Sequence, residues 1–164
     1  LLRRHAIEFP RGIKFSEDRT FNLLSIGYAG HMAYEKTAYY WRFVNTRSTV
    51  HRFHPDYFEA CLNAAEAIKG AISAAWGDND ALQTAYLRQL IGGAFSAICN
   101  YYYKTSPMSR AERTAAVRQL CQNRALRAAI TRTGISDIRA DWIMRQNAAM
   151  LGLYARAANL KHGR

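Results

Sequence analysis

Apolar side chains recur at spacings of three and four residues over most of the chain that follows Pro55. This is the period of a helix that buries one face. Gly77-Asp78-Asn79 interrupts the pattern and separates two long stretches of it, so we predict helices over about 55–76 and 79–103, with Pro55 as a first helical residue. The two apolar stripes are Phe58, Cys61, Ala65, Ile68, Ile72 and Trp76, and then Leu82, Tyr86, Leu90, Ala94 and Ile98.

The last third of the chain continues the helical pattern in shorter pieces. Ser109 and Glu112 have the spacing of a capping box, which predicts a helix start there. We expect a break near Asn123 and a short helix over about 126–130. The last predicted helix is capped by Ser136 or Asp137 and carries most of its apolar residues on one face, namely Ile138, Trp142, Ala149, Leu153, Ala157 and Leu160.

The first third has a different pattern. An irregular start over 1–16 leads to a short helix, with Ser16 as its expected N-cap and Gly27 as its stop signal. Residues 31–34 and 37–42 are short runs rich in aromatic residues, which predict two strands at the edge of a sheet. A polar loop over 43–53 follows, so we place a domain boundary near residue 54, giving domains over 1–54 and 55–164.

Composition and cysteine usage narrow the class of protein. The 164 residues are 49% hydrophobic and 12% aromatic, which is typical of a globular chain. The apolar runs are too short to span a bilayer. Cys61, Cys99 and Cys121 match no metal-binding spacing, so we interpret them as buried, reduced thiols in a cytoplasmic protein.

Positive charge is concentrated toward the C-terminal end. Residues 1–103 hold 11 Lys or Arg and 9 Asp or Glu, a net charge of +2, whereas residues 104–164 hold 12 and 3, a net charge of +9. A basic surface of this kind can serve anionic lipid, nucleic acid or an acidic partner. Charge alone does not choose among them.

Glu17 and Asp18 are the strongest candidates for chemistry. Two readings of this pair are open: first-turn acids are a general helix-start signal, and a carboxylate held there can also take a proton from a hydroxyl. The context is the run Phe9-Pro10-Arg11-Gly12-Ile13-Lys14-Phe15-Ser16-Glu17-Asp18-Arg19-Thr20-Phe21-Asn22, then Tyr39-Tyr40-Trp41-Arg42 and Arg47-Ser48. This ordered set, over roughly residues 7–55, closely resembles the last part of the catalytic domain of bacterial family-2 glycosyltransferases.

The resemblance implies a mainly α chain that combines two parts. The first is the C-terminal remnant of a GT-A α/β domain, with one helix and short edge strands, and the second is a helical bundle. It also implies inverting transfer of a sugar from a nucleotide-diphosphate sugar to an acceptor hydroxyl, in cell-surface polysaccharide or glycoconjugate synthesis. Asp18 is then the expected base, and Glu17 orients it or contacts the acceptor.

Arg42, Arg47, Ser48 and His51 are the expected substrate-binding residues. The resemblance implies that Arg42 binds the donor diphosphate and that the loop with Arg47, Ser48 and His51 closes over it. Arginine suits this role because its planar fork donates two parallel hydrogen bonds to phosphate oxygens. The alternative is that Arg42 pairs with a surface acid such as Glu35.

The nucleotide-binding half that the family places before the Glu-Asp pair is absent from this chain. It would carry an Asp-x-Asp motif for Mg²⁺ or Mn²⁺, and none precedes Glu17; the Asp-x-Asp spacing at 78–80 falls in a helix connection. We therefore expect the metal ligands to lie outside this chain and the isolated chain to be inactive.

A second class of function is a non-catalytic basic helical module that binds nucleic acid, a membrane surface or a protein partner. Nucleic acid is disfavoured, because the arginines of the last helices form no continuous stripe. Peripheral contact with the inner face of the plasma membrane and homo-oligomerisation remain open.

Overall fold

The computed structural model describes residues 1–40 and 52–161. Within these residues the chain forms seven helices and no strand, so the mainly α fold is confirmed. The predicted residues Arg42, Arg47, Ser48 and His51 lie outside the described part. No helix in the described part is long and apolar enough to cross a membrane.

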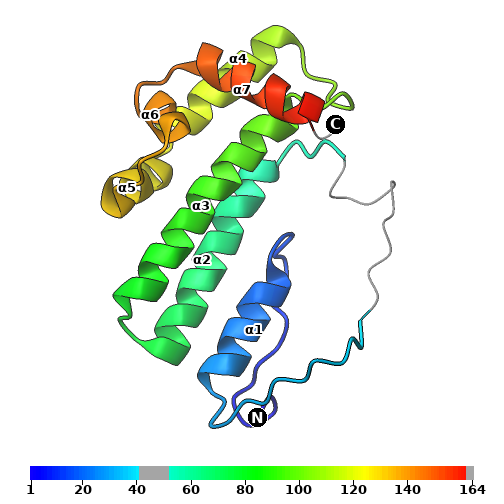
Figure 1. Ribbon diagram of the computed structural model, residues 1–164, viewed down its shortest axis with the longest axis vertical. Helices are drawn as coiled ribbons and strands as arrows, with labels where there is room; N and C mark the ends of the chain where they lie inside the picture. The colour runs from blue at the N-terminus through cyan, green and yellow to red at the C-terminus, as the bar shows by residue number, and fades with distance from the viewer. Residues whose placement is uncertain (41–51, 162–164) are drawn as a thin grey trace.

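Helices α2 (Tyr57–Trp76) and α3 (Asp80–Tyr101) form an antiparallel pair at the centre of the molecule (Figure 1). Their predicted apolar stripes face each other and the other helices. Ile68, Ile72, Ile91 and Ile98 are almost completely buried. Asn79 caps α3, because its side-chain oxygen accepts a hydrogen bond from the Leu82 N–H at 3.0 Å.

Helix α1 (Glu17–Gly27) packs along α2. Side chains reach across this contact to backbone carbonyls: the Trp76 indole donates to Leu23 at 3.4 Å, and the Tyr28 hydroxyl donates to Ala74 at 3.1 Å. Gly27 is the last residue of α1 and does not have a positive φ, so the glycine is not there to allow a left-handed turn. A Cβ atom there would lie 2.5 Å from the Ala75 Cβ, and the glycine is needed for close approach.

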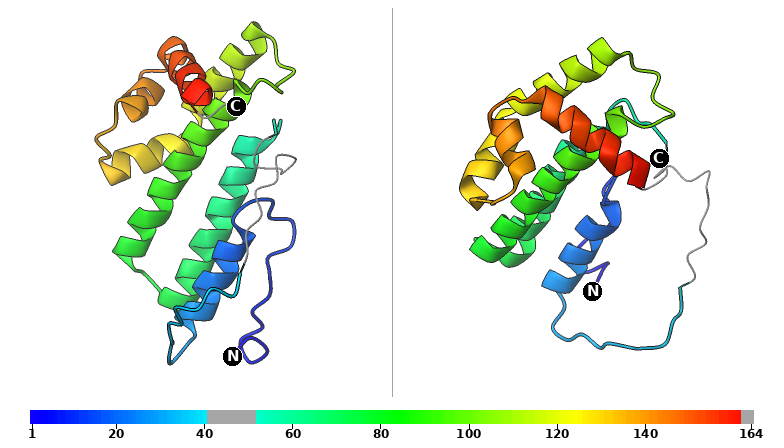
Figure 2. Two further views of the ribbon diagram at one scale, coloured as in Figure 1. Left: turned by 45° about the vertical axis from the view of Figure 1, so that its right-hand side comes forward. Right: turned by 45° about the horizontal axis from the view of Figure 1, so that its top comes forward.

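The remaining four helices cover one end and one side of α3 (Figures 1 and 2). They are α4 (Arg110–Gln122), α5 (Arg124–Thr133), α6 (Ile138–Met144) and α7 (Ala148–Lys161). The predicted capping box at Ser109 and Glu112 is present, with both of its hydrogen bonds. Asn159 of α7 is buried and donates to the Cys99 carbonyl at 2.9 Å, which fastens α7 to the end of α3.

Asn100, near the end of α3, is fully buried and fastens the chain that leads into α2. Its side-chain oxygen accepts from the His54 N–H at 2.9 Å, and its side-chain nitrogen donates to the His54 carbonyl at 2.8 Å. Pro55 belongs to this anchored segment, and α2 begins two residues later, at Tyr57. The prediction of Pro55 as a first helical residue is therefore wrong. The predicted boundary near residue 54 therefore crosses a hydrogen-bonded contact.

The two predicted strands are absent as far as they are described, over 31–34 and 37–40. These residues are extended and exposed, with Tyr34 at 87% and Tyr40 at 85% of full exposure. A pair of strands is marginal without a third strand or a packed face. No described helix supplies such a face, so aromatic content alone does not produce strands here.

The single last helix that we predicted is two helices, because the chain turns at Arg145–Asn147. Gln146 is left-handed, with φ 54°. The Gln146 N–H donates to the Ile143 carbonyl and the Asn147 N–H to the Trp142 carbonyl, which is the Schellman pattern that ends a helix. Asn147 then caps α7 through a 3.2 Å hydrogen bond from the Met150 N–H.

An arginine joins α3, α6 and α7. The Arg139 guanidinium lies 4.1 Å from the centre of the Phe95 ring and donates to the Tyr154 hydroxyl at 2.9 Å. It also donates to both carboxylate oxygens of Asp137, the cap of α6, with Nε to Oδ1 at 2.9 Å. These hydrogen bonds hold the pKa of the Asp137 carboxyl below its usual range.

This lowered pKa predicts a pH-dependent stability. A carboxyl whose pKa is lower in the folded than in the unfolded chain stabilises the fold above its unfolded pKa of about 3.9, and that contribution is lost as the pH falls through the folded pKa. We expect Asp137→Asn to lose about 1–3 kcal/mol of unfolding free energy at pH 7. Urea titrations at several pH values should show the difference from the natural chain shrinking below about pH 4; a constant difference down to pH 2 would contradict the assignment.

Two glycines give a matched test of the α1–α2 contact. Gly27→Ala should lower the free energy of unfolding by about 1–3 kcal/mol, because Ala75 Cβ cannot rotate away from the added methyl group. Gly70→Ala, on α2, meets no atom within 4 Å and should raise it by about 0.5–1 kcal/mol. Equal effects of the two substitutions in urea unfolding would show that the close approach is not a constraint.

Candidate functional site

Glu17 and Asp18 lie exposed in the first turn of α1, which we call the acid turn. Ser16 is the N-cap residue of α1, as predicted, but it is left-handed, with φ 61°, and its side chain makes no capping hydrogen bond. That hydrogen bond is replaced by one to Asp18, whose Oδ1 accepts from the Arg19 N–H at 2.7 Å. The Thr20 hydroxyl donates to the Ser16 carbonyl at 3.3 Å and closes the turn.

The position of Thr20 shows which way Asp18 points. Thr20 is buried and marks the inner side of α1. Successive helical residues are about 100° apart, so Asp18 lies about 200° around the helix from Thr20. The carboxylate therefore points away from the helical bundle. Within residues 1–40 and 52–161, neither Glu17 nor Asp18 forms an ion pair.

The acid turn is clamped to the start of α2. Lys14 Nζ donates to both carboxylate oxygens of Asp56, at 2.9 and 2.7 Å, and this contact lowers the pKa of Asp56. The Phe15 ring packs on the rings of His54 and Tyr57, with centroids 5.6 and 4.9 Å away. Because Asn100 fixes His54, the segment before the acid turn is connected to the end of α3 through two successive contacts, Phe15 with His54 and His54 with Asn100.

A hollow of about 450 Å³ opens on the Ser16 and Arg19 side of the acid turn. Its floor is the face of α3 where small residues leave room. A second hollow, of about 500 Å³, shares Tyr57, Gly92 and Ser96 with the first and extends to Arg139 and Tyr154. Besides Ser16 and Arg19, the first hollow is lined by Phe15, Tyr57, Cys61, Ala64, Ala65, Gln89, Leu90, Gly92, Gly93 and Ser96.

Cys61 is the one cysteine lining this first hollow, and its burial raises the pKa of the thiol to about 11. The thiolate is the nucleophilic form of cysteine. Cys61 is therefore a neutral packing residue at physiological pH. Cys121 behaves in the same way, with its pKa raised to about 11 by burial. None of the three cysteines forms a disulfide bond, but the predicted burial holds for Cys121 alone, because Cys61 and Cys99 are half-buried.

The acids in the described part of the chain do not assemble a metal site. No group of three or more His, Cys, Asp or Glu side chains there could hold a metal ion. In the Asp-x-Asp spacing at 78–80, Asn79 caps α3 and Asp80 lies 3.7 Å from Arg132. Glu35, the suggested partner of Arg42, accepts hydrogen bonds from the Thr37 N–H and hydroxyl at 3.0 and 2.9 Å.

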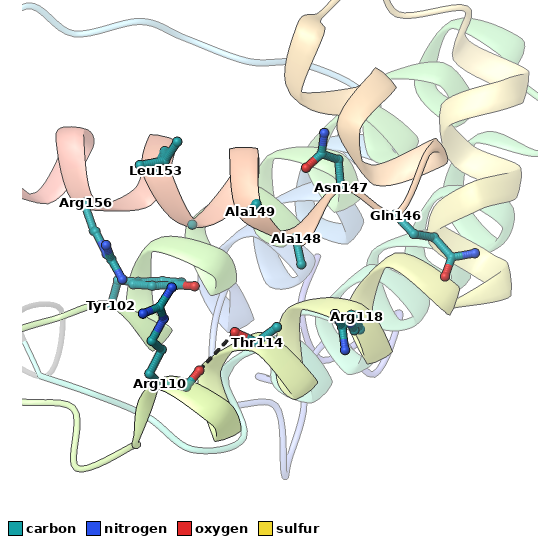
Figure 3. Close-up of a pocket in the computed structure, with 11 residues that line it drawn as sticks. Tyr102, Arg110, Thr114, Arg118, Gln146, Asn147, Ala148, Ala149, Leu153 and Arg156 are labelled. Atoms are coloured by element: carbon teal, nitrogen blue, oxygen red, sulfur yellow. Dashed lines mark hydrogen bonds between the residues drawn. The ribbon is translucent and has the colours of Figure 1, made fainter.

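A second candidate site, which the sequence analysis missed, is a groove of about 540 Å³ between α4 and α7 (Figure 3). We call it the arginine groove. Arg110, Thr114 and Arg118 follow one another every four residues along one face of α4, and Arg156 of α7 lies across from them. The spacing on α4 was visible in the sequence, but its partner on α7 was hidden by the wrong single-helix prediction. Tyr102, Gln146, Asn147, Ala148, Ala149, Gly152 and Leu153 complete the lining.

Tyr102 forms one end of the arginine groove. Its ring centre lies 5.5 Å from the Arg156 guanidinium carbon and 5.6 Å from that of Arg113. Its hydroxyl oxygen would lie only 2.6 Å from a Cβ atom at Gly152, so a larger residue there would displace the ring of Tyr102. The Tyr102 ring thus makes cation–π contacts with both Arg156 and Arg113.

No family model, no curated protein and no solved structure matches this chain.

The raised pKa of Cys61 gives a kinetic prediction. At pH 8 a thiol with a pKa of about 11 holds roughly 100-fold less thiolate than one with its ordinary value of 9.0. The folded chain carrying Cys99→Ser and Cys121→Ser should react with a disulfide reagent at least that much more slowly than the same chain in denaturant. Reaction of Cys61 at the same rate in both states would contradict its burial.

Proposed function

We propose that this chain is the acceptor-side part of an inverting family-2 glycosyltransferase, in which Asp18 is the base. The observation that carries the proposal is the acid turn: the exposed Asp18 carboxylate accepts the Arg19 N–H and points away from the bundle, and the preceding Lys14 is paired with Asp56 at the start of α2. The resemblance of the surrounding sequence supports it.

In the proposed reaction an acceptor hydroxyl attacks the anomeric carbon of a nucleotide-diphosphate sugar. An alcohol is a weak nucleophile until a base removes its proton. The hydroxyl proton passes to the Asp18 carboxylate as the new C–O bond forms, and the nucleotide diphosphate leaves with the electron pair of the broken bond, inverting the anomeric centre. Glu17 orients Asp18 or contacts the acceptor.

The remaining parts of the reaction need groups outside the described residues. Arg42, Arg47, Ser48 and His51 are proposed to hold the donor diphosphate, where arginine neutralises charge that develops on the leaving group. The nucleotide and any Mg²⁺ or Mn²⁺ are proposed to bind to a segment that this chain does not contain.

A hollow that could hold a sugar lies beside Ser16 and Arg19, although Asp18, which points away from the bundle, does not line it. It combines an aromatic ring, Tyr57, with polar side chains that include Gln89 and Ser96. Sugars are bound in this way, through ring stacking on an aromatic face and hydrogen bonds to amides and hydroxyls.

The arginine groove favours a second candidate function, a non-catalytic basic helical module. Three arginines and no acidic residue line it. In that case the acid turn is only a helix start, and the groove is the binding site.

Substitution of Asp18 tests the first function. In the full-length product of the gene that encodes this chain, Asp18→Asn should lower kcat for sugar transfer by roughly 10²–10⁴-fold, because the amide cannot accept the proton. Donor binding, followed by calorimetry, should stay within about twofold because Asp18 contacts the acceptor side.

The matched control is Asp78→Asn, which removes one exposed carboxylate from a helix connection and should leave kcat unchanged. Transfer that survives Asp18→Asn would remove the base assignment. A full-length protein that binds no nucleotide sugar would instead favour the binding-module function.

A further inference from the structure

Helix α7 is apolar on two sides. Its inner side is buried and contains Leu151 and Ala155. Its outer side carries Met150, Leu153 and Leu160, which follow the helical period and remain exposed; Leu153 is 57% and Leu160 is 76% exposed. Large aliphatic side chains that line up on the outside of a helix form a surface that water solvates poorly. We call this surface the outer face of α7.

Basic residues flank this outer face. Arg156 and Lys161 are exposed on α7 itself, and Arg110 and Arg118 lie across the arginine groove. Leu153 belongs to both features, because it lines the groove and lies on the outer face. Apolar and cationic side chains therefore meet along one edge of the molecule.

The acids of this region do not offset that charge. Residues 104–164 contain three acidic residues against twelve Lys or Arg. Glu112 is occupied by the capping box with Ser109, and Asp137 is bound by Arg139. Asp141, the third, lies on α6 and is not among the groove residues.

The lining of the groove has the charge to bind a phosphate group. Arg110 and Arg156 both extend toward Tyr102 in Figure 3, and Arg118 lies further along α4. Guanidinium groups bind phosphate oxygens through parallel N–H donors. Ala148 and Ala149, the first residues of α7, also line the groove, so the positive end of the α7 dipole lies there.

We propose that the outer face of α7 and the arginine groove together dock on the surface of an anionic lipid bilayer. Leu153 and Leu160 enter the boundary between headgroups and acyl chains, and a headgroup phosphate occupies the groove between Arg110 and Arg156. A helix with an apolar face and basic flanks lies in the plane of such an interface.

The aliphatic residues decide between a bilayer and other polyanions. Duplex DNA and free phosphate would use the arginines but would leave Leu153 and Leu160 in water. A bilayer surface uses both sets, since it attracts basic side chains and also accepts apolar ones. The inference does not depend on sugar transfer, and its test measures vesicle binding alone.

The test is cosedimentation of the 164-residue chain with vesicles of phosphatidylcholine containing 30 mol% phosphatidylglycerol. Vesicles of phosphatidylcholine alone, random duplex DNA and inorganic phosphate as a competitor complete the set. We expect binding to the anionic vesicles that weakens with salt, and little binding to the neutral ones.

Two double variants separate the apolar and charged contributions. Arg110→Gln with Arg156→Gln should weaken the partition coefficient about 30-fold, which corresponds to two basic residues near an anionic surface. Leu153→Ser with Leu160→Ser should weaken it at least 10-fold. The matched controls are Arg88→Gln with Arg124→Gln for charge, and Met32→Ser for an exposed apolar residue elsewhere; each should bind within about twofold of the natural chain.

A Leu153→Trp variant reports on insertion directly. Its fluorescence should shift to shorter wavelength on anionic vesicles and be quenched by brominated acyl chains, whereas Met32→Trp should show neither effect. Circular dichroism and thermal unfolding confirm that each variant is folded.

Three results would overturn the proposal. The first is no binding to anionic vesicles by the natural chain. The second is binding that the serine variant retains and that millimolar phosphate abolishes, which would assign the groove to a soluble phosphate compound. The third is preferential binding to duplex DNA with no fluorescence shift on vesicles, which would assign the arginines to nucleic acid.

Discussion

The architecture depends on one buried amide, that of Asn100. The fully buried Asn100 side chain pairs with both backbone groups of His54, at 2.9 and 2.8 Å. An unpaired amide in that position would be costly, so the chain before α2 must pass the end of α3 at this point. His54 in turn packs on Phe15, which precedes the acid turn. A polar side chain inside the core thus helps to position the two exposed carboxylates of the first helix.

Much of the helical framework could be predicted from the sequence, because the relevant signals are local. The stripes of α2 and α3 repeat over five turns, and the capping box of α4 needs only Ser109 and Glu112. The break between α6 and α7 could not be predicted, because it uses a Schellman turn with Gln146 where glycine is the usual residue. Missing that break also placed Ile138, Leu153 and Leu160 on an inner face, whereas all three are exposed.

The candidate sites differ in how far the sequence reveals them. The acid turn is a contiguous motif, so its residues could be named in advance, although its closure by Asp18 rather than Ser16 could not. The arginine groove depends on the register between α4 and α7, and Arg110 and Arg156 are 46 positions apart. The hollow beside the turn likewise exists only once α1, α2 and α3 are packed. A site built from several helices can be recognised only once the fold is known, whereas a site within a single turn can be recognised from the sequence.

Two neighbouring residues of α3 join these sites mechanically. The Cys99 carbonyl accepts the hydrogen bond from Asn159 of α7, and Asn100 binds the backbone of His54, next to the clamp on the acid turn. Successive backbone positions in a helix cannot move independently. The outer face of α7 and the Asp18 carboxylate therefore keep a fixed distance and orientation relative to each other. A surface bound by α7 would therefore lie at one constant distance from the Asp18 carboxylate.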